Sequence, residues 1–179
     1  MLLAHSILRF SGGILARILR VSSTLLPIML VGVPVENTLA QDFTFSSGGG
    51  SLTLTISTAT AGSEPDDETD NSTEIFWDAD FGLTAKMTVS TMCATQAFKL
   101  FVDFRVTTWG SGTAGTEQGE IALVDGMADT DIFRDIPSTL PGRTGNGTLT
   151  YRASATVADG NSVEHGDDFH TVTYTLLAQ

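Results

Sequence analysis

The stretch Phe98-Lys99-Leu100-Phe101-Val102-Asp103-Phe104-Arg105-Val106-Thr107 decides the fold class of this chain. Apolar residues occupy every second position from Phe98 to Val106, and most of the positions between them are charged or polar. A period of two places alternate side chains on opposite faces of an extended chain, whereas an amphipathic helix needs a period of about 3.6. The stretch therefore predicts a β-strand with one face in a hydrophobic core.

The same alternation recurs along the chain after residue 40. It is clear in residues 51–57, 83–89, 149–157 and 172–176, and weaker in residues 75–77 and 120–124. Glycine-containing segments typical of turns separate these stretches, at residues 46–50, 110–112, 141–147 and 159–161. Because no stretch has the length and period of an amphipathic helix, the sequence predicts an all-β, antiparallel β-sandwich (Ig-like or pilin-like) of about six to eight strands. Residues 129–136 fit a short helix or a loop equally well.

One segment of this domain departs from the pattern. Residues 62–74 carry six acidic side chains and no large hydrophobic one. Since nothing in the segment would offset the entropy lost on ordering, the sequence predicts an exposed acidic loop at 62–74.

Residues 1–40 have the features of an export signal. Three arginines (Arg9, Arg17 and Arg20) precede the apolar run 25–33, which is shorter than the roughly 20 residues that span a bilayer. Thr38-Leu39-Ala40 offers the small residues that a signal peptidase requires. The sequence predicts a signal peptide at 1–40, a β-sandwich domain at 41–179, no stable membrane insertion after cleavage, and export to the periplasm, cell surface or medium. An uncleaved anchor is the alternative.

The charge balance limits the partners. Twenty-one acidic residues face nine basic ones, which gives a formal net charge of −12. Such a chain repels phosphate backbones and anionic lipids, so we expect no nucleic-acid partner. Cys93 is the single cysteine, so no intrachain disulfide forms. We expect it to be a buried small hydrophobic residue rather than a reactive thiol, because the sequence places no base beside it.

Several features of the C-terminal half occur in a familiar order. They are the strand-like Phe98–Val102, the Pro-bearing Ile136-Pro137-Ser138, and a final Thr/Val/Tyr stretch, His170–Leu176. In this order, residues 83–179 resemble the secreted pilin-like sandwiches of the spore coat protein U and fimbrial-subunit type. The chain lacks the paired cysteines that many of those proteins have. The resemblance implies a structural or adhesive role, with no cofactor and no catalytic residues.

The start of the predicted mature chain suggests how such a subunit would assemble. In Gln41-Asp42-Phe43-Thr44-Phe45, the two phenylalanines alternate with polar residues and glycines follow. An extended segment of this kind can complete the open sheet of another copy, with Phe43 and Phe45 filling pockets. The alternative is that it forms the first strand of its own sandwich.

Three groups of polar residues are candidate metal or catalytic sites. Clustered carboxylates favour calcium, and they occur in two segments, at Asp66, Asp67, Glu68 and Asp70 and at Asp125, Asp129 and Asp131. Residues 165–170 combine His165, Asp167, Asp168 and His170, a ligand set that suits zinc. Asp78 and Asp80 are typical of paired glycosidase acids. Since no segment fits an EF-hand or nucleophile signature, we interpret the acids as solvated surface and residues 165–170 as a solvated turn.

The tryptophans point to a second class of function. Sugar-binding sandwiches stack rings on exposed aromatic faces, and Trp109 beside Gly110 is better placed for this than Trp77. A tryptophan in the core is the alternative for each. The sequence thus predicts a non-enzymatic exported structural or adhesive protein, a surface-coat or fimbrial-type subunit that self-assembles. The alternative is a carbohydrate-binding module with a glycan ligand.

Overall fold

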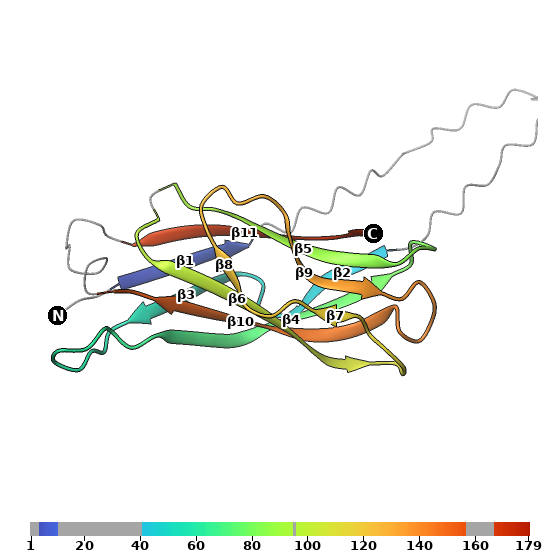
Figure 1. Ribbon diagram of the computed structural model, residues 1–179, viewed down its shortest axis with the longest axis horizontal. Helices are drawn as coiled ribbons and strands as arrows, with labels where there is room; N and C mark the ends of the chain where they lie inside the picture. The colour runs from blue at the N-terminus through green and yellow to red at the C-terminus, as the bar shows by residue number, and fades with distance from the viewer. Residues whose placement is uncertain (1–3, 11–40, 95, 157–166) are drawn as a thin grey trace, which may run out of the picture.

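The computed structural model describes residues 4–10, 41–94, 96–156 and 167–179, and this part of the chain is a two-layered β-sandwich without helices. Sheet A has the strand order β3 (Ser51–Ile56), β1 (Ala4–Phe10), β11 (Asp168–Ala178), β5 (Ala85–Met92), β9 (Thr130–Ile136) and β7 (Thr116–Glu117). Sheet B has the order β2 (Gln41–Ser47), β4 (Glu68–Ala79), β10 (Thr144–Ser154), β6 (Lys99–Trp109) and β8 (Ile121–Leu123). In Figure 1 the strands of both sheets run roughly along the long axis of the molecule.

The two sheets are joined by one core. Trp77 of β4 and Phe104 of β6 meet Phe133 of β9 with ring centroids 5.2–5.9 Å apart, and all three side chains are fully buried. Rings at these distances and angles add an edge-to-face attraction to the burial of their apolar area. A hydrogen bond of 2.7 Å between the hydroxyls of Tyr151 and Tyr174 also links β10 of sheet B to β11 of sheet A.

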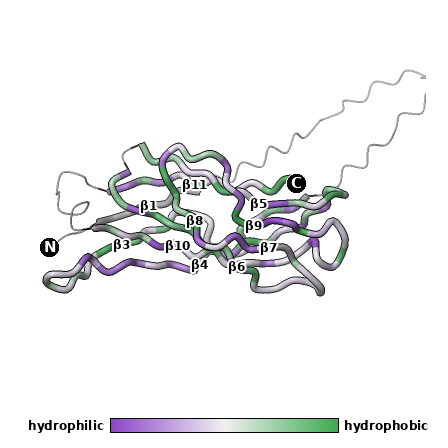
Figure 2. The backbone as a smooth tube through the Cα atoms, viewed as in Figure 1, coloured by the Kyte–Doolittle hydropathy of each residue, from purple (hydrophilic) through white to green (hydrophobic). Residues whose placement is uncertain are grey.

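The predicted all-β fold is confirmed, and so is the decisive strand. In β6, Leu100, Val102 and Phe104 are buried while Lys99 and Arg105 are exposed, as the period of two predicted. Hydrophilic and hydrophobic residues alternate along many of the strands in Figure 2. Within the described residues no helix is long and apolar enough to cross a membrane.

The described residues form eleven strands rather than the six to eight predicted, and for β9 the reason is a local failure of the alternation. β9 lies in the segment 129–136 that the sequence left unassigned. Within β9, the adjacent residues Ile132 and Phe133 are both buried. The register of β9 against β5 shifts twice, and Asp135 has a φ of 56°. Such β-bulges break the period of two that a sequence pattern relies on.

The predicted acidic loop at 62–74 is wrong over its second half. β4 begins at Glu68, so residues 68–74 form a strand that pairs antiparallel with β10. Backbone hydrogen bonds of the sheet offset the entropy cost of ordering, and Thr73 contributes a buried side chain. Most of the acidic side chains point to solvent, so a polar sequence is compatible with a strand that has one face in water.

Candidate functional site

β1 is the most unusual strand of the sandwich. It is formed by Ala4–Phe10, within the predicted signal peptide and outside the predicted β-sandwich domain at 41–179. It lies between β3 and β11, antiparallel to β3 with Ser6 opposite Leu54, and parallel to β11 with Leu8 opposite His170. Residues 11–40, which connect it to β2, lie outside the described part. A segment remote in sequence from its neighbours therefore completes sheet A.

The position that β1 occupies lies over the hydrophobic core. The residues of β3 and β11 in register with it include Leu54, Ile56, His170 and Val172, and all four are buried. Without a strand in this position, β3 and β11 would each present an unpaired backbone edge. We call this position, between residues 51–56 and 168–172, the β1 slot.

The candidate assembly residues Phe43 and Phe45 lie in β2, the end strand of sheet B. β2 pairs with β4, which places Phe43 opposite Trp77 and Phe45 opposite Ile75. Both phenylalanines are partly buried against the core, and the Phe45 ring lies 6.2 Å from that of Tyr174. In this structure β2 is thus the first strand of its own domain, the alternative that the sequence left open.

The two tryptophans occupy contrasting environments. Trp77 is fully buried, which makes it a core residue. Trp109, at the end of β6, is 46% exposed, and its indole N–H donates a hydrogen bond of 2.8 Å to the carbonyl oxygen of Gly112. Residues 107–112 line an open hollow of about 390 Å³ beside this indole. The arrangement is suited to stacking one face of a sugar ring.

Two of the candidate calcium ligands, Asp67 and Asp131, form ion pairs with basic side chains. Arg152 forms ion pairs of 2.6 Å with both Asp67 and Glu120, and Lys86 forms one of 2.7 Å with Asp131. The hydrogen bond from Arg152 lowers the pKa of Glu120, against the effect of partial burial. Asp78 and Asp80, the pair typical of glycosidases, both bind the guanidinium of Arg143. In the described ranges, neither acidic segment gathers three ligand side chains.

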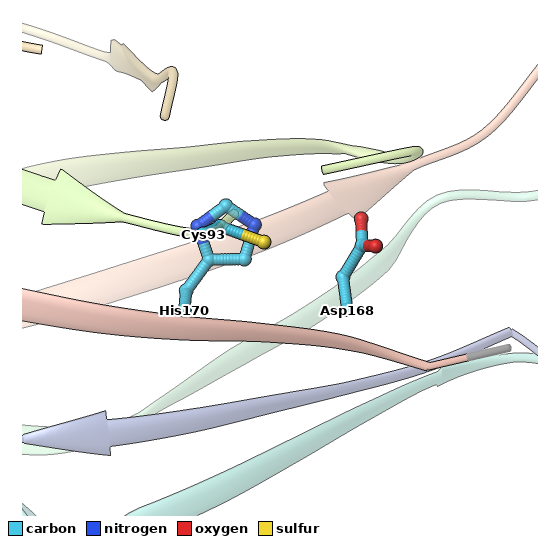
Figure 3. A group of neighbouring side chains, drawn as sticks. All are labelled: Cys93, Asp168 and His170. Carbon is cyan, nitrogen blue, oxygen red and sulfur yellow. The ribbon is translucent and has the colours of Figure 1, made fainter. Parts of the chain in front are cut away.

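Three potential ligands do converge elsewhere, in the interior. Cys93 follows β5, while Asp168 and His170 belong to the first residues of β11. Their side chains are 2%, 0% and 1% exposed, and the thiol, a carboxylate oxygen and an imidazole nitrogen all lie within 4.8 Å of one another. Figure 3 shows the Cys93 sulfur beside the His170 ring, on the side that faces Asp168.

Neighbouring groups hold the members of this buried cluster in place. The Asp168 carboxylate accepts hydrogen bonds from the backbone N–H groups of Ala97 and Phe98, at 2.9 and 2.7 Å. His170 Nδ1 lies 3.3 Å from the hydroxyl of Thr91, whereas its buried Nε2 has no hydrogen-bond partner within the described part of the chain. Burial lowers the pKa of His170, although the carboxylates of Asp168 and Asp125 act in the opposite direction.

The interpretation of residues 165–170 as a solvated turn is wrong for Asp168 and His170, which point into the core. β11 begins at Asp168, so the period of two buries both residues and exposes Phe169 between them. His165 lies outside the described residues. Cys93 is buried as predicted, but a base does lie beside it, because β11 pairs with β5 and sets Thr171 opposite Met92. The sequence pattern that indicates this burial is the alternation that places Asp168 and His170 on the same strand face as Val172.

The fold and its single core define the chain as an all-β sandwich protein. No protein-family model and no curated protein matches it. The resemblance to spore coat protein U and fimbrial subunits therefore stays a prediction, and any functional assignment depends on the arrangement of the strands and on the sites described above.

Proposed function

We propose that the chain is the exported, non-enzymatic subunit of a surface coat or fimbrial-type polymer whose copies are joined by exchange of β-strands. The observation that carries the proposal is the position of β1, a strand from within the predicted signal peptide that lies inside sheet A between β3 and β11. The cell surface or an extracellular polymer is the location that this function requires.

Cleavage after Ala40 would remove β1 from sheet A. Neighbouring strands lie about 4.8 Å apart, so loss of β1 leaves β3 and β11 separated by the width of one strand. Backbone groups on both sides lose their partners, and the buried side chains of Leu54 and Val172 lose their cover. Unpaired strand edges and uncovered core both favour capture of an extended segment from another chain. A cleaved subunit is thus incomplete alone.

β2 is the segment of the chain best suited to fill the slot of a second copy. It lies at the edge of sheet B, so only one of its sides pairs with its own domain. Its half-buried Phe43 and Phe45 alternate with exposed Asp42 and Thr44, the pattern that a strand over a core needs. Gly48 has a φ of 65° at the turn that follows, and glycine also permits other directions for the preceding strand.

The experiment separates acceptor from donor. A chain of residues 48–179 has the slot but lacks both β1 and β2, so it is an acceptor that cannot polymerise. Because a synthetic peptide of residues 41–47 can also return to the vacant β2 position beside β4, we expect two peptides to bind per chain, measured by calorimetry. Protection of the backbone amides of residues 168–172 from hydrogen exchange on peptide binding would identify the copy in the slot. The matched control is the same peptide with Phe43→Asp and Phe45→Asp, which should not bind.

Residues 41–179 provide the complementary test. Sedimentation velocity at increasing concentration should reveal growing oligomers, which electron microscopy should show as filaments. A compact monomer as stable as the full chain would contradict the proposal, because it would mean that the slot closes without a donor.

Glycan binding at Trp109 is a second candidate function. It is favoured by the exposed indole beside the hollow at residues 107–112. Titration with soluble polysaccharides should change the fluorescence of Trp109 while the buried Trp77 stays constant. In Trp109→Ala the fluorescence change should vanish without any change in sedimentation. A polysaccharide response that persists in this variant would exclude the site.

A further inference from the structure

We propose that Cys93, Asp168 and His170 bind one zinc ion in the interior of the sandwich. The proposal does not depend on strand exchange, since it concerns a different set of atoms. Thiolate, imidazole and carboxylate are the three ligand types that zinc takes in proteins. Here one of each, from β11 and from the residue that follows β5, reaches the same buried point.

The spacing of the three groups suits a single ion. Ligand atoms at about 2.0–2.3 Å from a tetrahedral zinc lie on the order of 3.4–3.8 Å from one another. The three atoms of the cluster are within 4.8 Å of each other. Side-chain shifts of about 1 Å would therefore bring them to coordination distance, and an exogenous ligand such as water would take the fourth position.

The imidazole of His170 is a second, independent observation that favours a metal ion at this cluster. His170 is 1% exposed, and its Nε2 has no hydrogen-bond partner among the described residues, although buried polar atoms are nearly always satisfied. Nδ1 faces the hydroxyl of Thr91. When Nδ1–H donates to that hydroxyl, the lone pair of Nε2 is left for a metal, the arrangement that positions most metal-binding histidines.

Charge and support around the cluster agree with a divalent cation. The backbone N–H groups of Ala97 and Phe98 orient the Asp168 carboxylate, which keeps lone pairs for coordination. The Asp125 carboxylate accepts a hydrogen bond of 2.6 Å from the N–H of Cys93 and so fixes the backbone that carries the thiol. Zinc binding converts the thiol to thiolate and releases its proton to solvent. The ion then neutralises two buried negative charges.

Burial also argues against the other chemistry of a Cys–His pair. A thiol nucleophile must meet its substrate, and Cys93 is only 2% exposed. Three protein ligands and a water form the coordination usual for catalytic zinc, but burial closes this site to a substrate, so we assign the ion a structural role. The ion would tie the end of β5 to the start of β11, the strand that forms one side of the β1 slot.

The experiment uses the full chain, stripped with a chelator and dialysed against limiting zinc. We expect about one zinc per chain by elemental analysis. With cobalt(II) as a spectroscopic probe, we expect a thiolate-to-cobalt charge-transfer band and the intense visible bands of tetrahedral coordination. Cys93→Ser should abolish the charge-transfer band, and His170→Gln should weaken zinc binding at least about tenfold in competition with a chromophoric chelator. Asp129→Asn, at an exposed carboxylate that is not one of the three proposed ligands, is the matched control.

A second variant keeps the test independent of folding defects. Thr91→Val removes only the hydroxyl that faces Nδ1, and loss of such a partner lowers metal affinity about 10–100-fold. Circular dichroism of each variant without metal verifies that the fold is retained. Less than about a tenth of a zinc per chain, or a cobalt spectrum unchanged in Cys93→Ser, would overturn the proposal.

Discussion

Sheets A and B differ in the origin of their strands. Every strand of sheet B comes from residues 41–154, and each pairs antiparallel with its neighbours. Sheet A takes β1 from the first ten residues and pairs it parallel with β11. Parallel neighbours require a long connection, whereas antiparallel neighbours can be joined by a short turn. Sheet B is therefore complete within the predicted mature domain, and sheet A is not.

The difference between the two sheets indicates which strand can leave the sandwich while the core between the sheets remains. The core and the rings of Trp77, Phe104 and Phe133 join the two sheets over the half of the molecule that contains β9. The β1 slot, by contrast, is bounded by β3, which among the described strands pairs with β1 alone. Removal of β1 would leave β3 without a hydrogen-bonded neighbour in its sheet.

The largest effect is expected from deletion of β1. In residues 41–179 kept monomeric by dilution, backbone amides of 168–172 in β11 should exchange with solvent on the order of 100-fold faster than in the full chain. Amides of β10 in sheet B should change far less. Hydrogen exchange followed by mass spectrometry of peptides measures both. Equal acceleration in the two sheets would mean global destabilisation, and the contrast between them would not hold.

Truncation of the shared rings should have the next largest effect. Phe104→Ala in sheet B and Phe133→Ala in sheet A should each lower the free energy of unfolding by about 3–5 kcal/mol. Because the two rings lie 5.2 Å apart in one cluster, the double variant should cost less than the sum of the single variants. Urea unfolding of the full chain measures all three. Strict additivity would show that the sheets unfold separately.

Sequence periodicity predicted the sheet faces well because burial imposes a period of two on residues such as Leu100, Val102 and Phe104. It failed for β9, where a bulge buries Ile132 and Phe133 side by side. It also failed for β1 and for the Cys93–His170 contact. Both depend on the pairing partners of β11, and pairing between remote segments leaves no mark in the local pattern.

The tyrosine pair offers a smaller, pH-dependent test of the link between the sheets. Burial raises the pKa values of Tyr151 and Tyr174 above the ordinary value of 10.0. The folded state therefore holds protons that the unfolded chain releases, so the contribution of the two tyrosines to stability is constant below about pH 10 and falls as the pH rises further. Tyr174→Phe should cost about 1 kcal/mol at neutral pH and should reduce this alkaline loss. Urea midpoints between pH 7 and pH 11 test the slope, and an unchanged slope in the variant would contradict it.

The smallest effect is expected on the outer face of sheet B. The guanidinium of Arg152 lies 4.0 Å from the centre of the Phe101 ring and pairs with Asp67 and Glu120. These side chains are partly exposed, and ion pairs in such positions contribute only about 0–1 kcal/mol. Arg152→Gln should therefore lower the unfolding free energy by less than about 1 kcal/mol, and high salt should reduce the difference further. A loss of several kcal/mol would instead mean that this face contributes to the free energy of unfolding as much as core residues do. The stability of sheet B would then depend on ionic contacts outside the core as well as on its complete set of strands.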